Sequence, residues 1–161
     1  MSLPNVRGGQ DAKFDVAKLS ENGRKAYGEV FNAGLFAVGP VGWEAQTSEA
    51  ELALHVLLAE KEAVSALRSL INDASPEGSL YGLLGLRFVD IGAFKQEIEN
   101  YKTKPGPPER ESEPSSRFKT PKGHVVTQRG CIILRRPREN IVNTIEAGDY
   151  DKVFKVTAGS N

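Results

Sequence analysis

Apolar side chains recur at spacings of three and four between residues 47 and 101, which is the period of helices with one buried face. Ser48 and Glu51 form a capping box, in which each side chain satisfies an amide at a helix start. Residues 75–77, Ser-Pro-Glu, combine a capping hydroxyl, a preset backbone angle and a carboxylate at the positive end of the helix dipole. The pattern therefore predicts helices that begin at Ser48 and at Ser75.

Further helices are predicted on both sides of these two. Residues 20–33 form a first helical pattern with Ser20 as its cap, and Asp90 can cap a last helix whose apolar face ends at Tyr101. No glycine or proline separates the two apolar stripes that meet around residues 59–61, so a turn and a bend both stay open there.

Three glycines lie along one side of the helix that begins at Ser75. Gly78, Gly82 and Gly85 are spaced as i, i+4 and i+7. A glycine inside a helix costs about 1 kcal/mol relative to alanine, so this stripe predicts a compensating close approach of another element. A ligand groove along the same side is the alternative, which makes these glycines candidate binding residues.

The pattern changes after residue 102. Residues 103–123 contain five prolines and predict either a mobile surface loop or a functional arm. Residues 124–134 are rich in β-branched residues interrupted by Arg129 and Gly130, which predicts a small hairpin. A short helix should follow Pro137 and end at Gly148, and the last few residues should fray.

These elements predict a mainly α fold, with stacked helical hairpins, a small C-terminal β-hairpin and a short final helix. Over residues 47–101 the successive hairpins resemble HEAT-like folds in organisation, and this resemblance implies no functional residue. The length of 161 residues suits a single domain over 1–161. Within it we expect a helical block at 18–102, the proline-rich loop and a hairpin-plus-helix segment at 124–156.

Composition narrows the class of protein. With 39% hydrophobic and 26% charged residues the chain is typical of a globular protein, and no apolar run is long enough for a membrane span. Cys131 is the only cysteine, so no internal disulfide can form. We expect Cys131 inside a strand and the protein in the cytoplasm. Export with a signal peptide that this chain lacks is the alternative.

Charge is separated along the chain although the total is zero. Residues 114–138 contain seven Lys and Arg and no Asp or Glu, whereas residues 1–113 contain 12 basic and 17 acidic residues. The candidate binding residues here are Arg129, Arg135, Arg136 and Arg138. An acidic protein surface is the predicted partner. Nucleic acid is disfavoured because only one aromatic residue lies in this segment and no known nucleic-acid motif surrounds it. Pairing of these residues with the chain's own acidic helices is an alternative to both kinds of partner.

Catalytic signals are sparse. His55 and His124 lie in no metal-ligand spacing, no phosphate-binding loop is present, and we predict neither a metal nor a cofactor. Residues 35–46 contain Gly39, Pro40 and Gly42 and should form a loop anchored by Trp43, a further candidate binding residue.

The leading hypothesis is a non-catalytic module that binds or inhibits another protein. Anion or nucleic-acid contact through the basic segment is the second. The third is an enzyme with a polar cleft near Trp43, Tyr81 and His55. The sequence predicts no oligomeric state.

Overall fold

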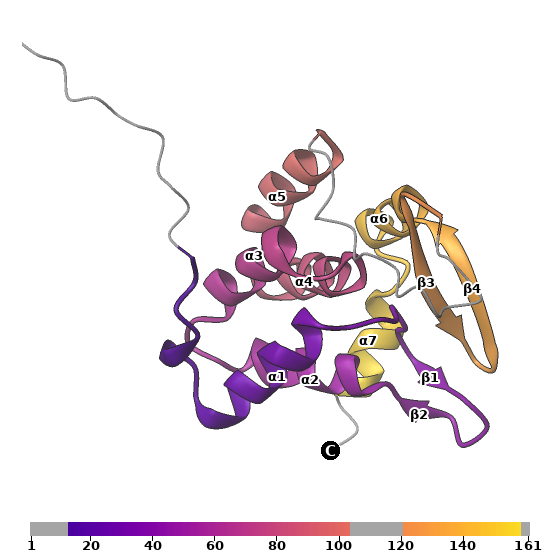
Figure 1. Cartoon of the computed structure of the whole chain (residues 1–161), viewed down its shortest axis with the longest axis horizontal. Coiled ribbons are helices and arrows are strands. Elements are labelled where there is room, and N and C mark those ends of the chain that lie inside the picture. Colours follow the sequence, from indigo (N-terminus) through magenta and orange to yellow (C-terminus); the bar gives the residue numbers. More distant parts are fainter. Residues whose placement is uncertain (1–12, 104–120, 159–161) are drawn as a thin grey trace, which may run out of the picture.

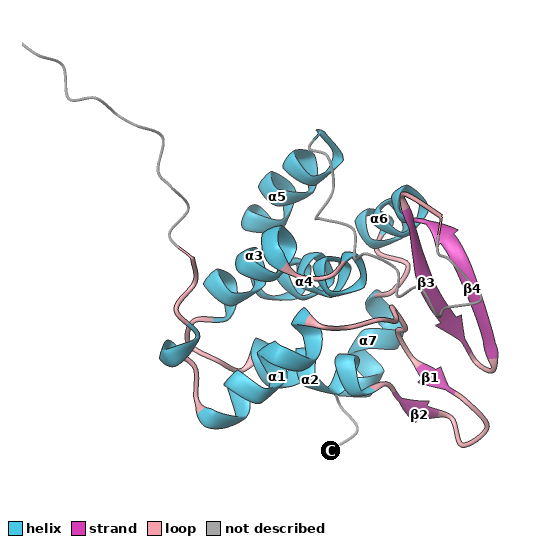
Figure 2. Cartoon of the chain, viewed as in Figure 1, coloured by secondary structure: helices cyan, strands magenta, loops and turns pink. Residues whose placement is uncertain are grey.

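The computed structural model describes residues 13–103 and 121–158 of the chain. Within them the chain forms mainly helices, with strands gathered on one side of the helical body (Figures 1 and 2). In chain order the elements are a 3-10 turn at Val16–Lys18, α1 Glu21–Phe31, β1 Pro40–Val41, β2 Gln46–Thr47, α2 Glu49–Leu58, α3 Ala63–Asp73, α4 Pro76–Val89, α5 Ile91–Thr103, β3 His124–Arg129, β4 Ile132–Pro137, α6 Arg138–Ala147 and α7 Asp151–Ala158.

Helix α4 lies at the centre of the body (Figure 1). It begins where predicted, because the Ser75 hydroxyl accepts a hydrogen bond from the Gly78 amide and Pro76 occupies the first turn. All its residues from Glu77 to Leu86 are buried. It packs against α1, α2, α3, α5, α6 and β3. A helix that is apolar all round is the expected core of such an arrangement.

The glycine stripe of α4 is filled by the chain's own helices. A Cβ added at Gly78 would lie 2.3 Å from the Val30 carbonyl oxygen of α1, and one at Gly82 would lie 3.0 Å from the Leu67 carbonyl oxygen of α3. At Gly85 it would meet the Leu67 side chain at 2.8 Å. The predicted close packing is confirmed, and these three glycines line no open groove.

The structure confirms a mainly helical fold with a small antiparallel hairpin near its C-terminal end. HEAT-like stacking is not confirmed, because several helices surround α4 instead of following one another in a row. Residues 59–61 form a turn between α2 and α3, so the sequence-based alternative of a bend is excluded.

The sequence pattern does not predict helix α7. Its Phe154 packs on the His55 ring, with ring centroids 4.3 Å apart, and on Phe88, with ring centroids 4.7 Å apart.

Two two-stranded antiparallel sheets are formed, β1 with β2 and β3 with β4. The chain at Phe36 runs beside β3, where the Phe36 amide donates to the Val126 carbonyl at 2.8 Å and its carbonyl accepts from the Gln128 amide at 3.3 Å. The first turn of α4 also reaches β3, because the Glu77 carboxylate accepts from the Val126 amide at 3.1 Å. The hairpin is thereby hydrogen-bonded to the helical body.

None of the described helices is both long and apolar enough to cross a membrane. The proline-rich loop predicted at 103–123 lies largely outside the described residues, as do the last three residues, for which fraying was predicted.

Replacing Gly78 by alanine should destabilise the protein by about 2 kcal/mol, because the new methyl group would overlap a backbone oxygen that no rotamer change can move. Gly28 of α1 is the matched control. A Cβ there meets nothing within 4 Å, so Gly28→Ala should stabilise by about 0.5–1 kcal/mol through helix propensity. Urea unfolding measures both values, and equal effects of the two substitutions would contradict close packing at Gly78.

Candidate binding surface

The β3–β4 ribbon has one face directed at the helical body. Val125 and Thr127 of β3 are buried, and their cross-strand partners on the same face are Arg136 and Leu134. The next pair along this face is Arg129 with Ile132. Ile133 pairs with Gln128 and therefore lies on the opposite face.

Strand β4 is exposed along its whole length. Its first three residues are apolar, with exposed fractions of 61% for Ile132, 60% for Ile133 and 52% for Leu134. Because these side chains alternate between the two faces, the ribbon presents apolar groups on both sides near its turn. Three consecutive exposed aliphatic residues on a strand are uncommon without a partner.

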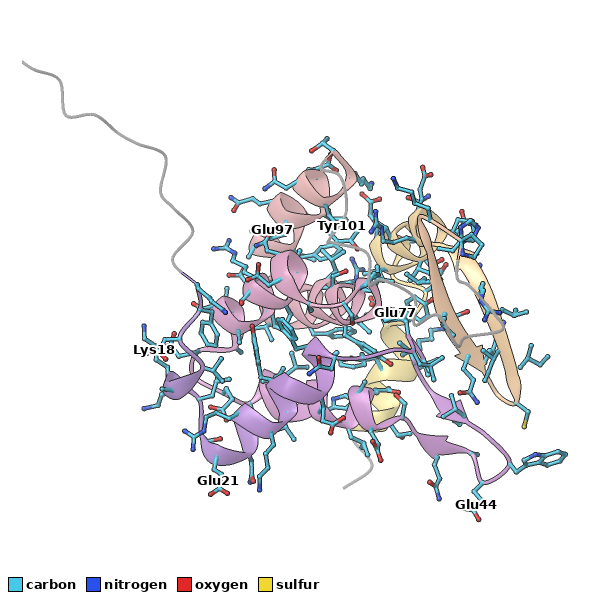
Figure 3. All side chains as sticks on the ribbon, in the orientation of Figure 1. Lys18, Glu21, Glu44, Glu77, Glu97 and Tyr101 are labelled. Atoms are coloured by element: carbon cyan, nitrogen blue, oxygen red, sulfur yellow. The ribbon has the colours of Figure 1, made fainter. Side chains whose placement is uncertain are left out.

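Trp43 directly follows Gly42, whose backbone is hydrogen-bonded to this turn, and is 96% exposed. The prediction that it anchors its loop is wrong. It sits in the connection between β1 and β2, and that connection joins the hairpin because the Gly42 amide donates to the Gly130 carbonyl at 2.9 Å. Figure 3 shows Glu44, the next residue, at the outer end of the same connection. An indole held in water in this way exposes a large apolar area.

We call the exposed part of the β3–β4 ribbon near its turn, together with the connection between β1 and β2, the hairpin surface. It consists of Trp43, Ile132, Ile133 and Leu134, with the basic residues Arg129, Arg135 and Arg136.

The predicted arginines fall into two groups. Arg138 lies over the Tyr101 ring at 5.5 Å, which places it on the α5 side and not among the exposed apolar residues. Arg129 and Arg136 lie near the hydroxyl of Tyr150. Burial raises the pKa of Tyr150, and the positive charges of these two arginines partly offset that rise.

Several ion pairs join residues of the helical body to one another. They include Lys25 with Glu21, Arg68 with Glu97, Arg87 with Asp151 and Lys102 with Glu146. Within the described residues, none of these pairs uses Arg129 or Arg136. Neutralisation by the chain's own acidic helices is therefore not seen for these two side chains.

The side chains proposed for an enzymatic cleft do not come together. Tyr81 is fully buried and its hydroxyl bonds the backbone of Ala37, while the His55 ring stacks on Phe154. Trp43 points into solvent on a separate loop. Among residues 13–103 and 121–158, no group of three or more His, Cys, Asp or Glu could hold a metal ion.

A cleft of about 1010 Å³ lies beside α3 and carries charges of both signs. Lys18 and Arg68 line it together with Glu62, Asp73 and Glu97. Arg68 already pairs with Glu97 at 3.3 Å, so the lining does not select a ligand of either charge.

Sequence reasoning missed the exposed apolar residues of β4. The run Ile-Ile-Leu has the composition of a buried strand, and the Arg-Arg pair after it was the only signal that this strand leaves the core. Cys131 was expected inside a strand; it lies in the exposed turn between β3 and β4.

Comparison with described protein families, with curated protein sequences and with solved structures finds no match for this chain. The hairpin surface therefore has to be interpreted from its own chemistry.

His55 should make the stability of the protein depend on pH. Burial lowers the pKa of His55 below its ordinary value of 6.5, so the folded protein binds this proton less readily than the unfolded chain. The resulting stability is fully present above about pH 6.5 and declines as the pH falls through that value towards the lower pKa of the folded state. His55→Phe keeps an aromatic ring against Phe154 and removes the titration.

The measurement is the urea unfolding free energy of both proteins at several pH values from about 7.5 to 5. The wild type should lose stability relative to His55→Phe as the pH falls. Parallel pH curves for the two proteins would show that His55 does not titrate in this way.

Proposed function

We propose that this protein is a non-catalytic binding module that engages, and by doing so inhibits or neutralises, another protein through the hairpin surface. One observation carries the proposal: Trp43 is almost completely exposed, its neighbour Gly42 is bonded to the β3–β4 turn, and the first three residues of β4 after that turn are exposed and aliphatic. Tryptophan and arginine are the residues that most often dominate the binding energy of protein interfaces, and this surface offers both.

The arginines favour an acidic partner. Residues 114–138 carry basic charges without one acidic residue, and Arg129 and Arg136 flank the exposed apolar group. Complementary charge speeds association and selects partners, while the apolar centre supplies most of the affinity. The helical block then serves as the rigid support, and the stacked-hairpin organisation expected from the sequence would be one form of such a support.

Cys131 provides a direct test because it is the only cysteine and lies in the exposed turn beside the apolar residues. A photoreactive cross-linker attached to Cys131 should yield one defined protein adduct in an extract of the native host. Leu134→Ser should reduce the yield at least tenfold, because an interface residue that packs against the partner contributes on the order of 1–2 kcal/mol. Leu52→Ser is the matched control, since Leu52 is also 52% exposed but lies on α2.

Charge is tested separately. Arg129→Glu with Arg136→Glu should lower the adduct yield at least tenfold, whereas Lys61→Glu with Lys95→Glu, which makes the same change in net charge on the helical body, should leave it within twofold. The wild-type yield should fall as salt is added.

Two parallel measurements expose the alternatives. Trp43 is the only tryptophan, so its fluorescence reports contact at this surface. A shift to shorter wavelength on phosphatidylserine vesicles, or on a single-stranded DNA oligomer, without any protein adduct would overturn the proposal in favour of a lipid or nucleic-acid partner.

A further inference from the structure

Residues 36–39 connect the helical core to the hairpin surface, and we call them the connecting segment. Phe36 and Ala37 are 2% and 1% exposed. Phe36 bonds β3 through both its amide and its carbonyl, as described above. The segment then continues through Gly39 into β1 and the connection that carries Trp43, where Gly42 bonds the hairpin turn. The backbone from Phe36 to Gly42 is thus hydrogen-bonded to β3 at one end and to the hairpin turn at the other.

Tyr81 of α4 holds the first half of this segment. Its hydroxyl accepts a hydrogen bond from the Ala37 amide at 2.8 Å and donates to the Ala37 carbonyl at 2.9 Å. The Ser48 hydroxyl lies 3.3 Å away. Tyrosine is protonated at neutral pH and can donate this bond, and burial raises the pKa of Tyr81 further, to about 12.

Glu51 of α2 holds the second half. Its side chain is fully buried, and one carboxylate oxygen accepts from the Gly39 amide at 2.9 Å. The first turn of α2 favours a carboxylate through the helix dipole, which lowers the cost of burying it. A well-packed apolar side chain is nevertheless often as stabilising as a buried charge. What the carboxylate adds is a fixed orientation of the Gly39 peptide, because a hydrogen bond requires the amide to point at the accepting oxygen.

We infer that Glu51 and Tyr81 are positioning residues of the hairpin surface: they fix the connecting segment, and thereby hold the loop of Trp43 in a defined position relative to β4. This inference rests on the proposed function, because only a surface that binds a partner needs the Trp43 loop and β4 in a defined arrangement. Neither side chain contacts the partner itself.

The fold offers a matched control two residues from Tyr81 on α4, at Ser79. Tyr101 is another largely buried tyrosine, and its hydroxyl bonds the Ser79 hydroxyl at 2.7 Å. Tyr101→Phe therefore removes a buried tyrosine hydrogen bond, as Tyr81→Phe does, without touching the connecting segment.

The test follows hydrogen exchange of single amides by NMR. Tyr81→Phe and Glu51→Met should each raise exchange at the Gly42 amide at least tenfold relative to the Leu84 amide in α4, because the bond from Gly42 to the hairpin turn opens when the segment loosens. Tyr101→Phe should change both amides equally. Glu51→Gln keeps an oxygen that can accept from Gly39 and should restore slow exchange at Gly42, and it also covers the case in which Glu51→Met fails to fold.

Equal changes at Gly42 and Leu84 in Tyr81→Phe and Glu51→Met would show a purely structural role and overturn the inference. Exchange at Gly42 that is as fast in Glu51→Gln as in Glu51→Met would also overturn it, because the position of the segment would then not depend on the oxygen that accepts from Gly39. The yield of the Cys131 adduct separates the two proposals. Faster exchange at Gly42 with an unchanged adduct supports positioning and contradicts the proposed use of Trp43 in binding.

Discussion

The close approach of backbone to backbone along α4 is the constraint on which the rest of the structure depends. Carbonyl oxygens of Val30 and Leu67 lie where a side chain on Gly78 or Gly82 would have to be. Helices α1 and α3 can therefore cover α4 without a layer of side chains between them, and the leucines on its other sides are free to contact α2, α5 and α6. The roughly 1 kcal/mol that each glycine costs is offset by this contact.

Polar groups on α4 and α2 do what apolar packing cannot, because dispersion and the hydrophobic effect have no direction. Glu77 holds β3, Tyr81 holds the connecting segment and Arg87 holds α7 through two bonds to Asp151, at 3.0 and 3.1 Å. Each of these side chains joins the central helix to a piece that has little core of its own. The exposed hairpin can accordingly be ordered while burying only one face of β3.

Local signals predicted the helix starts well, since Ser20, Ser48 and Ser75 each cap the helix that follows through a hydrogen bond between neighbours in sequence. The close packing of the glycine stripe was also predictable, because its spacing is helical. Exposure was not. The exposure of Trp43 and of the Ile-Ile-Leu run depends on how far the ribbon extends beyond the helices. The Arg-Arg pair after the run indicates that this strand can leave the core, but no local pattern encodes the distance.

The shape of the hairpin surface limits the kind of partner that could use all of it. Ile132 and Leu134 lie on one face of the ribbon and Ile133 on the other, so a flat partner covers only part of the exposed aliphatic area. A concave partner can enclose both faces, take up the Trp43 indole beside the turn and place acidic groups at its rim near Arg129 and Arg136. Enclosure would also dehydrate the apolar centre while leaving the charges partly in water, where they contribute more to the rate and selectivity of association than to its strength.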